Sequence, residues 1–128
     1  MADASMQVEL VAADRLVWSG EATMVIARTA EGDIGVLAHH TPVLSVLVPG
    51  VVKITADNEN RLAAVDGGFV SVAGNRVSIL SEHAEMADDI DVSQARSDLE
   101  GAGAADDEDA NAAARAWAEA RIRAAEAS

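Results

Sequence analysis

Short apolar segments with alternating polar positions fill the first two thirds of the chain. Residues 6–12, MQVELVA, alternate apolar and polar side chains, although Val11 interrupts the polar row. Similar runs rich in valine and isoleucine continue to Ile79, and these branched side chains favour a pleated sheet. Turn-forming residues separate the runs, as in an antiparallel β-sandwich or barrel. The predicted turns lie at residues 13–14, Gly20, 31–32, 49–50, 57–60, 67–68 and 74–75.

The apolar positions change to a helical period after residue 88. Asp91 is the expected N-cap of a first helix, and Gln94, three residues later, is expected to complete a capping box with it. Gly101 and Gly103 then end or weaken this helix. Its narrow apolar stripe consists of Val92, Ala95, Leu99 and Ala102.

A second helix is predicted over residues 110–127, where ten of the eighteen residues are alanine, the strongest helix former. Asp109 is its expected N-cap. The predicted apolar stripe consists of Ala114, Ala118, Ile122 and Ala125, with Trp117 beside them. Two stripes of small side chains suit a close antiparallel pair that packs only loosely on the sandwich. The predicted fold is therefore α+β, with an antiparallel β-sandwich in residues 1–88 and an antiparallel helical hairpin in residues 89–128.

Composition limits both the core and the chemistry. The only aromatic residues are Trp18, Phe69 and Trp117, so the core must be built from valine, leucine, isoleucine and alanine. There is no cysteine, hence neither a disulfide nor a thiolate nucleophile. The N-terminal segment lacks the pattern of a secretory signal, and no apolar run approaches the roughly 20 residues that span a bilayer. We therefore expect a soluble intracellular protein.

The acidic residues are unevenly distributed along the chain. The net charge is −13, which disfavours nucleic acid or anionic lipid as a direct partner. Residues 82–110 contain eleven acids and one base, Arg96, whereas residues 1–81 have a net charge of −4 and residues 111–128 of +1. This asymmetry indicates a boundary near residues 82–89.

Adjacent histidines, His39 and His40, are the first candidates for catalysis or metal binding. They lie in a Gly- and Pro-containing segment that we expect to be a loop between strands. Neighbouring side chains diverge in strands and helices, and His83 lies forty-three residues away, so a metal site or a cupin-like metalloenzyme is disfavoured. The sequence contains no phosphate-binding loop, nucleophile elbow or EF-hand. The residues indicate a subunit or adaptor rather than an enzyme.

Three segments, in order, resemble motifs of one known family. They are WSGEA at residues 18–22, GDIGVLAHHTPVLSVLVPGVVKI at residues 32–54 and VDGGFVSVAGNRVSILSEHAEMADDID at residues 65–91. They are similar to the epsilon subunit of bacterial rotary ATP synthases. The resemblance implies a non-catalytic rotor subunit of the proton-translocating synthase, bound to the gamma subunit and the c-ring. It also implies a peripheral position on the cytoplasmic face of the membrane, without insertion. The alternative is a free-standing acidic β-sandwich adaptor.

The resemblance also assigns residues to the c-ring and to the catalytic hexamer. The loop at residues 31–40 would contact the c-ring, with Glu31, Asp33 and His40 as candidates. The hairpin would be able to enter the alpha/beta hexamer and inhibit ATP hydrolysis. The candidate inhibitory contacts are Arg115, Arg121 and Arg123.

Some members of the family bind ATP on the hairpin, and this chain keeps part of that pattern. The matching positions are Glu85, Ile90, Asp91 and Arg121. Gln94, Gly101 and Trp117 stand where further arginines are expected. Because each lost guanidinium removes a bidentate phosphate contact, ATP binding is predicted to be weak or absent, and no other cofactor is expected.

Overall fold

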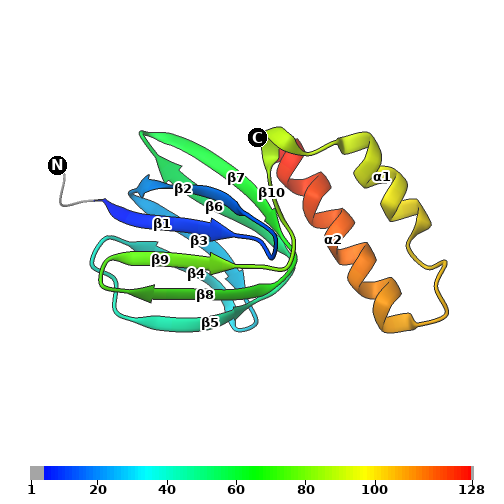
Figure 1. Cartoon of the computed structure of the whole chain (residues 1–128), viewed down its shortest axis with the longest axis horizontal. Coiled ribbons are helices and arrows are strands. Elements are labelled where there is room, and N and C mark those ends of the chain that lie inside the picture. The colour runs from blue at the N-terminus through cyan, green and yellow to red at the C-terminus, as the bar shows by residue number, and fades with distance from the viewer. Residues whose placement is uncertain (1–4, 128) are drawn as a thin grey trace.

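The computed structural model describes residues 5–127, and within this range ten strands precede two α-helices (Figure 1). The strands are β1 (Met6–Val11), β2 (Leu16–Ala22), β3 (Met24–Thr29), β4 (Gly32–Leu37), β5 (Val43–Leu47), β6 (Gly50–Ala56), β7 (Glu59–Val65), β8 (Gly68–Ala73), β9 (Arg76–Leu80) and β10 (Ala84–Met86). The helices are α1 (Val92–Gly101) and α2 (Glu108–Ala127), preceded by a 3₁₀ turn, Ala87–Asp89. The α+β prediction is confirmed; residues 1–4 and 128 of the predicted ranges lie outside the described part.

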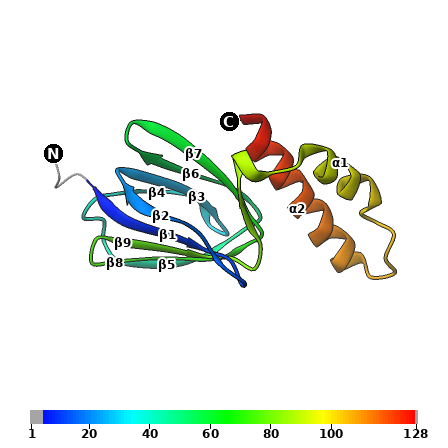
Figure 2. The ribbon, with the colours of Figure 1, turned by 45° about the horizontal axis from the view of Figure 1, so that its top comes forward.

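The strands form two layers packed face to face (Figure 2). One layer has the order β10-β7-β6-β3-β4, and the other has the order β5-β8-β9-β1-β2, joined by the pairing of Thr29 with Leu47. Neighbouring strands are antiparallel except β1 and β9, which run parallel. Parallel and antiparallel strands show the same alternation of apolar and polar side chains, so the sequence did not indicate that β1 and β9 run parallel.

Valine, leucine, isoleucine and alanine make up nearly all of the buried core between the layers, as the composition predicted, and Met6 joins them with Trp18 and Met86 partly buried against the cluster. The largest fully buried side chains are Leu10, Ile54, Ile79, Val8, Val25, Val36, Val52, Val65, Val70 and Val77. Phe69 is the only phenylalanine, and it lies on the outside with 51% of its surface exposed. Packing of branched aliphatic residues therefore supplies the apolar burial that stabilises the sandwich.

The prediction of a loop over residues 31–40 is wrong for residues 32–37. Residues 32–37 form β4, which pairs along its whole length with β3, and the turn lies at residues 30–31. An edge strand tolerates glycine and acidic residues because one of its sides faces solvent. The turn predicted at Gly20 is also wrong. Gly20 lies within β2, where an added Cβ would meet the ring of Trp18 at 3.0 Å.

The caps of the helices agree only partly with prediction. Asp91 accepts a hydrogen bond from the backbone N–H of Gln94 at 3.1 Å, which confirms the first cap. The side chain of Gln94 donates to Asp98 instead of returning to the cap, so the expected capping box is only half formed. Asp107, not Asp109, caps α2 by accepting from the N–H groups of Asp109 and Ala110. In a run of four acids, each was able to serve as the cap.

The second helix has a wider buried face than the sequence predicted. Ala114, expected in the apolar stripe, is exposed. The buried residues of α2 are Asn111, Ala118, Ala120, Arg121 and Ala124. Alanine and arginine contribute little to a hydrophobic pattern, so the sequence did not indicate that Ala120, Arg121 and Ala124 are buried. Neither helix in residues 5–127 is long and apolar enough to cross a membrane.

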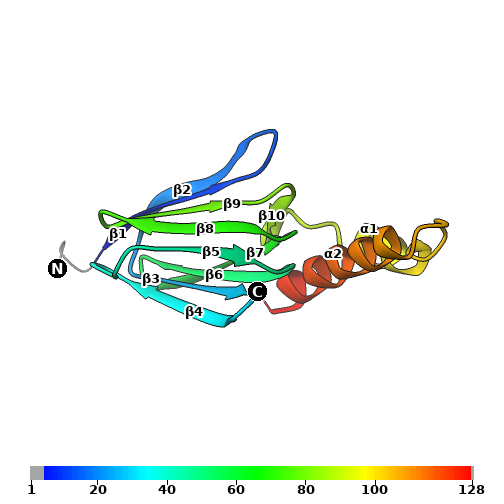
Figure 3. The same ribbon diagram turned by 90° about the horizontal axis from the view of Figure 1, so that it is seen from below.

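The hairpin stands at one end of the sandwich, and α2 covers the outer face of β6 and β7 there (Figure 3). The contact is built mainly from alanines, Ala64 of β7 and Ala87 meeting Ala120 and Ala124 of α2. Larger, partly buried side chains surround them: Val51, Leu62, Ile90 and Trp117. This arrangement brings one hairpin residue singled out from the sequence, Arg121, within 3.1 Å of Glu85 on β10.

Candidate functional site

Strand β4 separates His40 from the other two candidates for c-ring contact, Glu31 and Asp33. Glu31 lies in the β3–β4 turn, Asp33 is the second residue of β4, and His40 follows its end by three residues. Six extended residues span roughly 20 Å. The structure therefore places Glu31 and Asp33 at the hairpin end of the sandwich and His40 at the opposite end, instead of in one loop.

Asp33 lies beside a basic groove at that end. Its carboxylate is 3.1 Å from Nε of Arg28, and both side chains are more than half exposed, so this ion pair contributes little to stability. Asp33, Arg28 and Arg123 of α2 line one cavity of about 240 Å³. The structure thus brings a candidate inhibitory residue to the same groove as a candidate c-ring residue.

The two adjacent histidines lie in the chain after β4, at the opposite end of the sandwich. His39 has a positive φ of 66°, and its backbone N–H donates to Asn75 at 2.8 Å. Nδ1 of His40 lies 2.6 Å from the carbonyl oxygen of Thr41 and donates to it. Among residues 5–127, no three histidine or acidic side chains lie close enough together to hold a metal ion. The structure thus places the paired histidines in a connection, where His40 contacts its neighbouring backbone and His39 is held through its own backbone N–H.

Arg121 is the centre of the most organised polar cluster in the hairpin. Its side chain is only 9% exposed, and Nη1 donates to Oδ2 of Asp98 on α1 at 2.8 Å. Nε lies 3.1 Å from Oε1 of Glu85 on β10. The guanidinium carbon is 5.6 Å from the centroid of the Trp117 ring, within range of a cation–π attraction. Of the four ATP candidates, the structure joins Glu85 and Arg121, whereas Asp91 caps α1 and Ile90 packs beside the alanine contact.

The two carboxylates act differently on the guanidinium. The hydrogen bond from Arg121 lowers the pKa of Asp98 below its usual value, and the hydrogen bond from Gln94 lowers it further. Nε of Arg121 is buried and has no well-directed hydrogen bond to any residue in 5–127, despite its short distance from Glu85. The contact with Glu85 is therefore mainly an attraction between charges, and the contact with Asp98 fixes direction.

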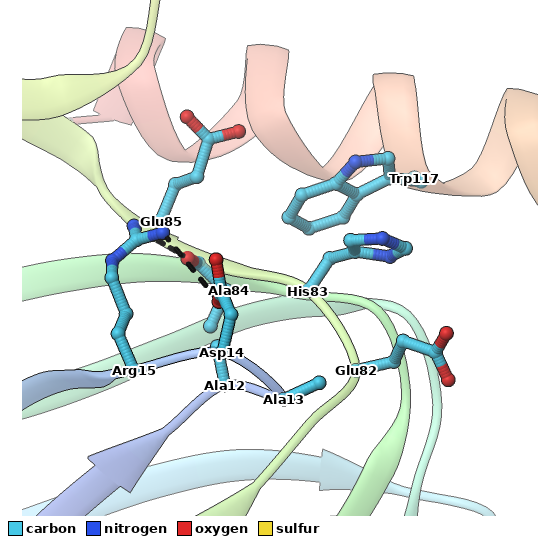
Figure 4. Close-up of a pocket in the computed structure, with 9 residues that line it drawn as sticks. All are labelled: Ala12, Ala13, Asp14, Arg15, Glu82, His83, Ala84, Glu85 and Trp117. Carbon is cyan, nitrogen blue, oxygen red and sulfur yellow. Dashed lines mark hydrogen bonds and ion pairs between the residues drawn. The ribbon is translucent and has the colours of Figure 1, made fainter.

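A pocket of about 370 Å³ lies between the sandwich and α2, next to this cluster (Figure 4). The rings of His83 and Trp117 stack there at 5.8 Å, and Nδ1 of His83 lies 3.0 Å from a carboxylate oxygen of Asp66. Buried Ser81 holds this segment in place, since its hydroxyl accepts from the N–H of Asp66 and donates to the carbonyl of His83. Sequence reasoning missed Asp66, His83 and Asp98, because nothing in their spacing links residues on different elements.

A row of apolar side chains crosses the outer face of the second layer. The ladders place Val46 opposite Phe69, Phe69 opposite Leu80, Leu80 opposite Val11 and Val11 opposite Leu16, across five strands. We call these five residues the apolar row. All but Val11 are at least 46% exposed. Val11, Phe69 and Leu80 also line an open groove of about 430 Å³. Contiguous exposed apolar surface of this kind is typical of a protein interface.

Sequence analysis missed the apolar row. The outer faces of β1, β8 and β9 are otherwise polar or small, and local alternation does not show that their single apolar residues lie side by side. The one available signal was Val11, which interrupts the polar positions of the first strand.

Comparison with known proteins gives a consistent answer. The family model of the ATP synthase delta/epsilon chain, β-sandwich domain, matches residues 5–87. The ATP synthase epsilon chain of Streptomyces avermitilis is 54% identical over 122 residues, covering 94% of this chain and 95% of that protein. The epsilon chain of Rhodococcus jostii is 53% identical over 125 residues, covering 96% and 98%.

A solved structure is similar along nearly the whole chain. A chain of the mitochondrial ATP synthase of Euglena gracilis, determined together with the c-ring, has a TM-score of 0.75 and 25% identity, covering 97% of this chain and 81% of that one. The resemblance drawn from the three sequence motifs is confirmed. The chain belongs to the family of ATP synthase epsilon chains, which are non-catalytic subunits of that complex.

Proposed function

We propose that this chain is a rotor subunit of the central stalk, linking the gamma subunit to the c-ring of a proton-translocating ATP synthase. Its membership of the epsilon family and its likeness to a chain solved together with a c-ring support this role. In the complex it lies at the cytoplasmic face of the membrane as a peripheral subunit.

The apolar row is the observation that carries the proposal, and we assign it to the gamma subunit. The chain has a single phenylalanine, and 51% of its surface is exposed in the middle of this row. Leu44, on the same strand as Val46, is 71% exposed and extends the apolar surface. Burying such side chains against a partner is favourable at about 25 cal/mol per Å² of apolar area. A rotor subunit requires a firm grip of this kind, because torque passes through the contact.

The c-ring contact is assigned to the β3–β4 turn. Glu31 is exposed there, and the carboxylate of Asp33 lies on the adjoining exposed edge of β4. His40 lies at the other end of β4, so a single flat contact would not include it. We therefore keep Glu31 and Asp33 as the c-ring residues and place His40 outside that surface.

The hairpin has a regulatory role in this proposal. Arg115 and Arg123 are exposed on α2 and are available to acidic surfaces of the alpha/beta hexamer. Arg121 is buried against the sandwich, so it becomes available only when the hairpin is released. The segment before α2 is acidic, so the same acidic surfaces would repel it. We therefore expect only modest inhibition.

Binding to purified gamma subunit tests the apolar row. We expect Phe69→Ser to weaken binding roughly ten-fold or more, as for an aromatic anchor at the centre of an interface. The matched control is Leu37→Ser, because Leu37 is 59% exposed but lies on β4 in the other layer. Equal losses in the two variants, or no binding of wild-type chain to gamma, would contradict the proposal.

A further inference from the structure

We propose that Arg121 is an internal latch that holds the hairpin folded on the sandwich without a bound nucleotide. This inference rests on the regulatory role proposed for the hairpin. One guanidinium, on α2, contacts Asp98 on α1 at 2.8 Å and Glu85 on β10 at 3.1 Å. It thereby ties both helices to the strand that leads into them.

Burial gives these contacts more weight than ordinary surface pairs. The Arg121 side chain is 9% exposed, and those of Asp98 and Glu85 are 43% and 29% exposed. A buried charge that loses a partner is strongly destabilising, because it keeps the cost of leaving water without the compensating attraction. The Trp117 ring adds a third attraction for the same cation.

The remaining contacts of the hairpin are weaker. The pair of Arg96 and Glu126 joins the two helices at 2.9 Å, but its side chains are 61% and 57% exposed, so it contributes little. The contact between α2 and the sheet has four small alanines at its centre, and the larger side chains around it, Val51, Leu62, Ile90 and Trp117, are only partly buried. The position of the folded hairpin therefore depends chiefly on Arg121 and its partners.

Asp98 and Glu85 occupy the guanidinium of Arg121, which is the group that the family resemblance implies for nucleotide binding. Carboxylate and phosphate oxygens match the guanidinium fork in the same way. With Asp98 and Glu85 in place, a phosphate would have to displace one of them to reach Arg121. The chain's own carboxylates thus do in the folded hairpin what a bound phosphate would do, which agrees with the prediction of weak ATP binding.

Distance measurements on the isolated full chain test the latch. The chain has no cysteine, so spin labels at Ala73→Cys on the sandwich and Ala113→Cys on α2, both exposed positions, report the separation of the hairpin from the sandwich. We expect Asp98→Asn and Glu85→Gln each to raise the released population roughly ten-fold or more. In the Asp98→Glu variant, which keeps the charge, the hairpin should stay mostly folded.

Glu126→Gln is the matched control, because it breaks the exposed ion pair within the same hairpin. The latch is refuted if Asp98→Asn and Glu85→Gln leave the distances unchanged, or if Glu126→Gln releases the hairpin equally. Hydrogen exchange in β1 and β9 should stay at the wild-type rate, which separates hairpin release from loss of the sandwich. If the hairpin opens but ATP hydrolysis by the complex does not change, the regulatory role fails and the latch stands.

Discussion

Replacing Gly68 by alanine tests how closely β8 and β9 must approach beside the apolar row. Gly68 has a φ of +106°, where side chains other than hydrogen are strained. An added Cβ would stand 1.8 Å from the carbonyl oxygen of Leu80 and 2.9 Å from the Cα of Ser81. These are backbone atoms of β9 and its end, so the clash cannot be relieved by a side-chain rotation.

The cost of Gly68→Ala follows from two contributions. The backbone conformation costs about 1–3 kcal/mol for a residue with a side chain. Separating β8 from β9 to make room adds about 1–3 kcal/mol, as in other overpacked sites. Together these contributions predict a loss of about 2–6 kcal/mol, which is a large part of the about 5–15 kcal/mol that stabilises a typical domain.

Urea unfolding followed by circular dichroism measures this loss. Gly32→Ala is the matched control, since Gly32 has a φ of +122° but nothing within 4 Å of an added Cβ. Its substitution should show the conformational cost alone. If Gly68→Ala costs no more than Gly32→Ala, the close approach of the two strands does not constrain the sequence and the reasoning is wrong.

Two further predictions concern the hairpin. Asn111 is buried and exchanges two hydrogen bonds with the backbone of Ala105, at 3.0 and 3.2 Å, so Asn111→Ala should destabilise the turn between the helices by about 1–3 kcal/mol and speed hydrogen exchange at residues 102–107. The folded pKa of Asp98 is lowered, so its carboxylate stabilises the fold above its unfolded pKa and this contribution is lost as the pH falls through the folded value. We therefore expect the difference in unfolding free energy between wild type and Asp98→Asn, measured by urea unfolding, to be constant near neutral pH and to shrink in acid. The same should hold when both proteins also carry Glu85→Gln. A difference that persists in acid would contradict this reasoning.

Local patterns predicted the fold because they repeat locally. Alternation and turn residues identified most strands, and the change of period after residue 88 identified the helices. Gly20 and the segment with Gly32 and Gly35 were misread for one reason: glycine was taken as a turn, whereas here it lies within edge or paired strands. The parallel pairing of β1 with β9 depends on contacts between distant segments, which no local pattern encodes.

The candidate site was less predictable because it depends on which elements meet. Arg121 was selected from the sequence, but its partner Asp98 lies twenty-three residues earlier on another helix. Trp117 was treated as a lost arginine, and the structure shows it facing both Arg121 and His83. Charges and aromatic rings can be found by residue type, whereas their pairing requires the packing of α2 on β7.

The alanine contact between α2 and the sheet has a consequence for solubility. A helix that leaves its resting place exposes whatever side chains it had buried, and large apolar ones would favour aggregation. Here the centre of the newly exposed surface would consist of methyl groups from Ala64, Ala87, Ala120 and Ala124, and the larger side chains around it, Val51, Leu62, Ile90 and Trp117, are already partly exposed. Methyl groups are tolerated in water at small cost, so both positions of the helix would remain soluble. The small side chains at the centre of this contact are therefore suited to an element that moves.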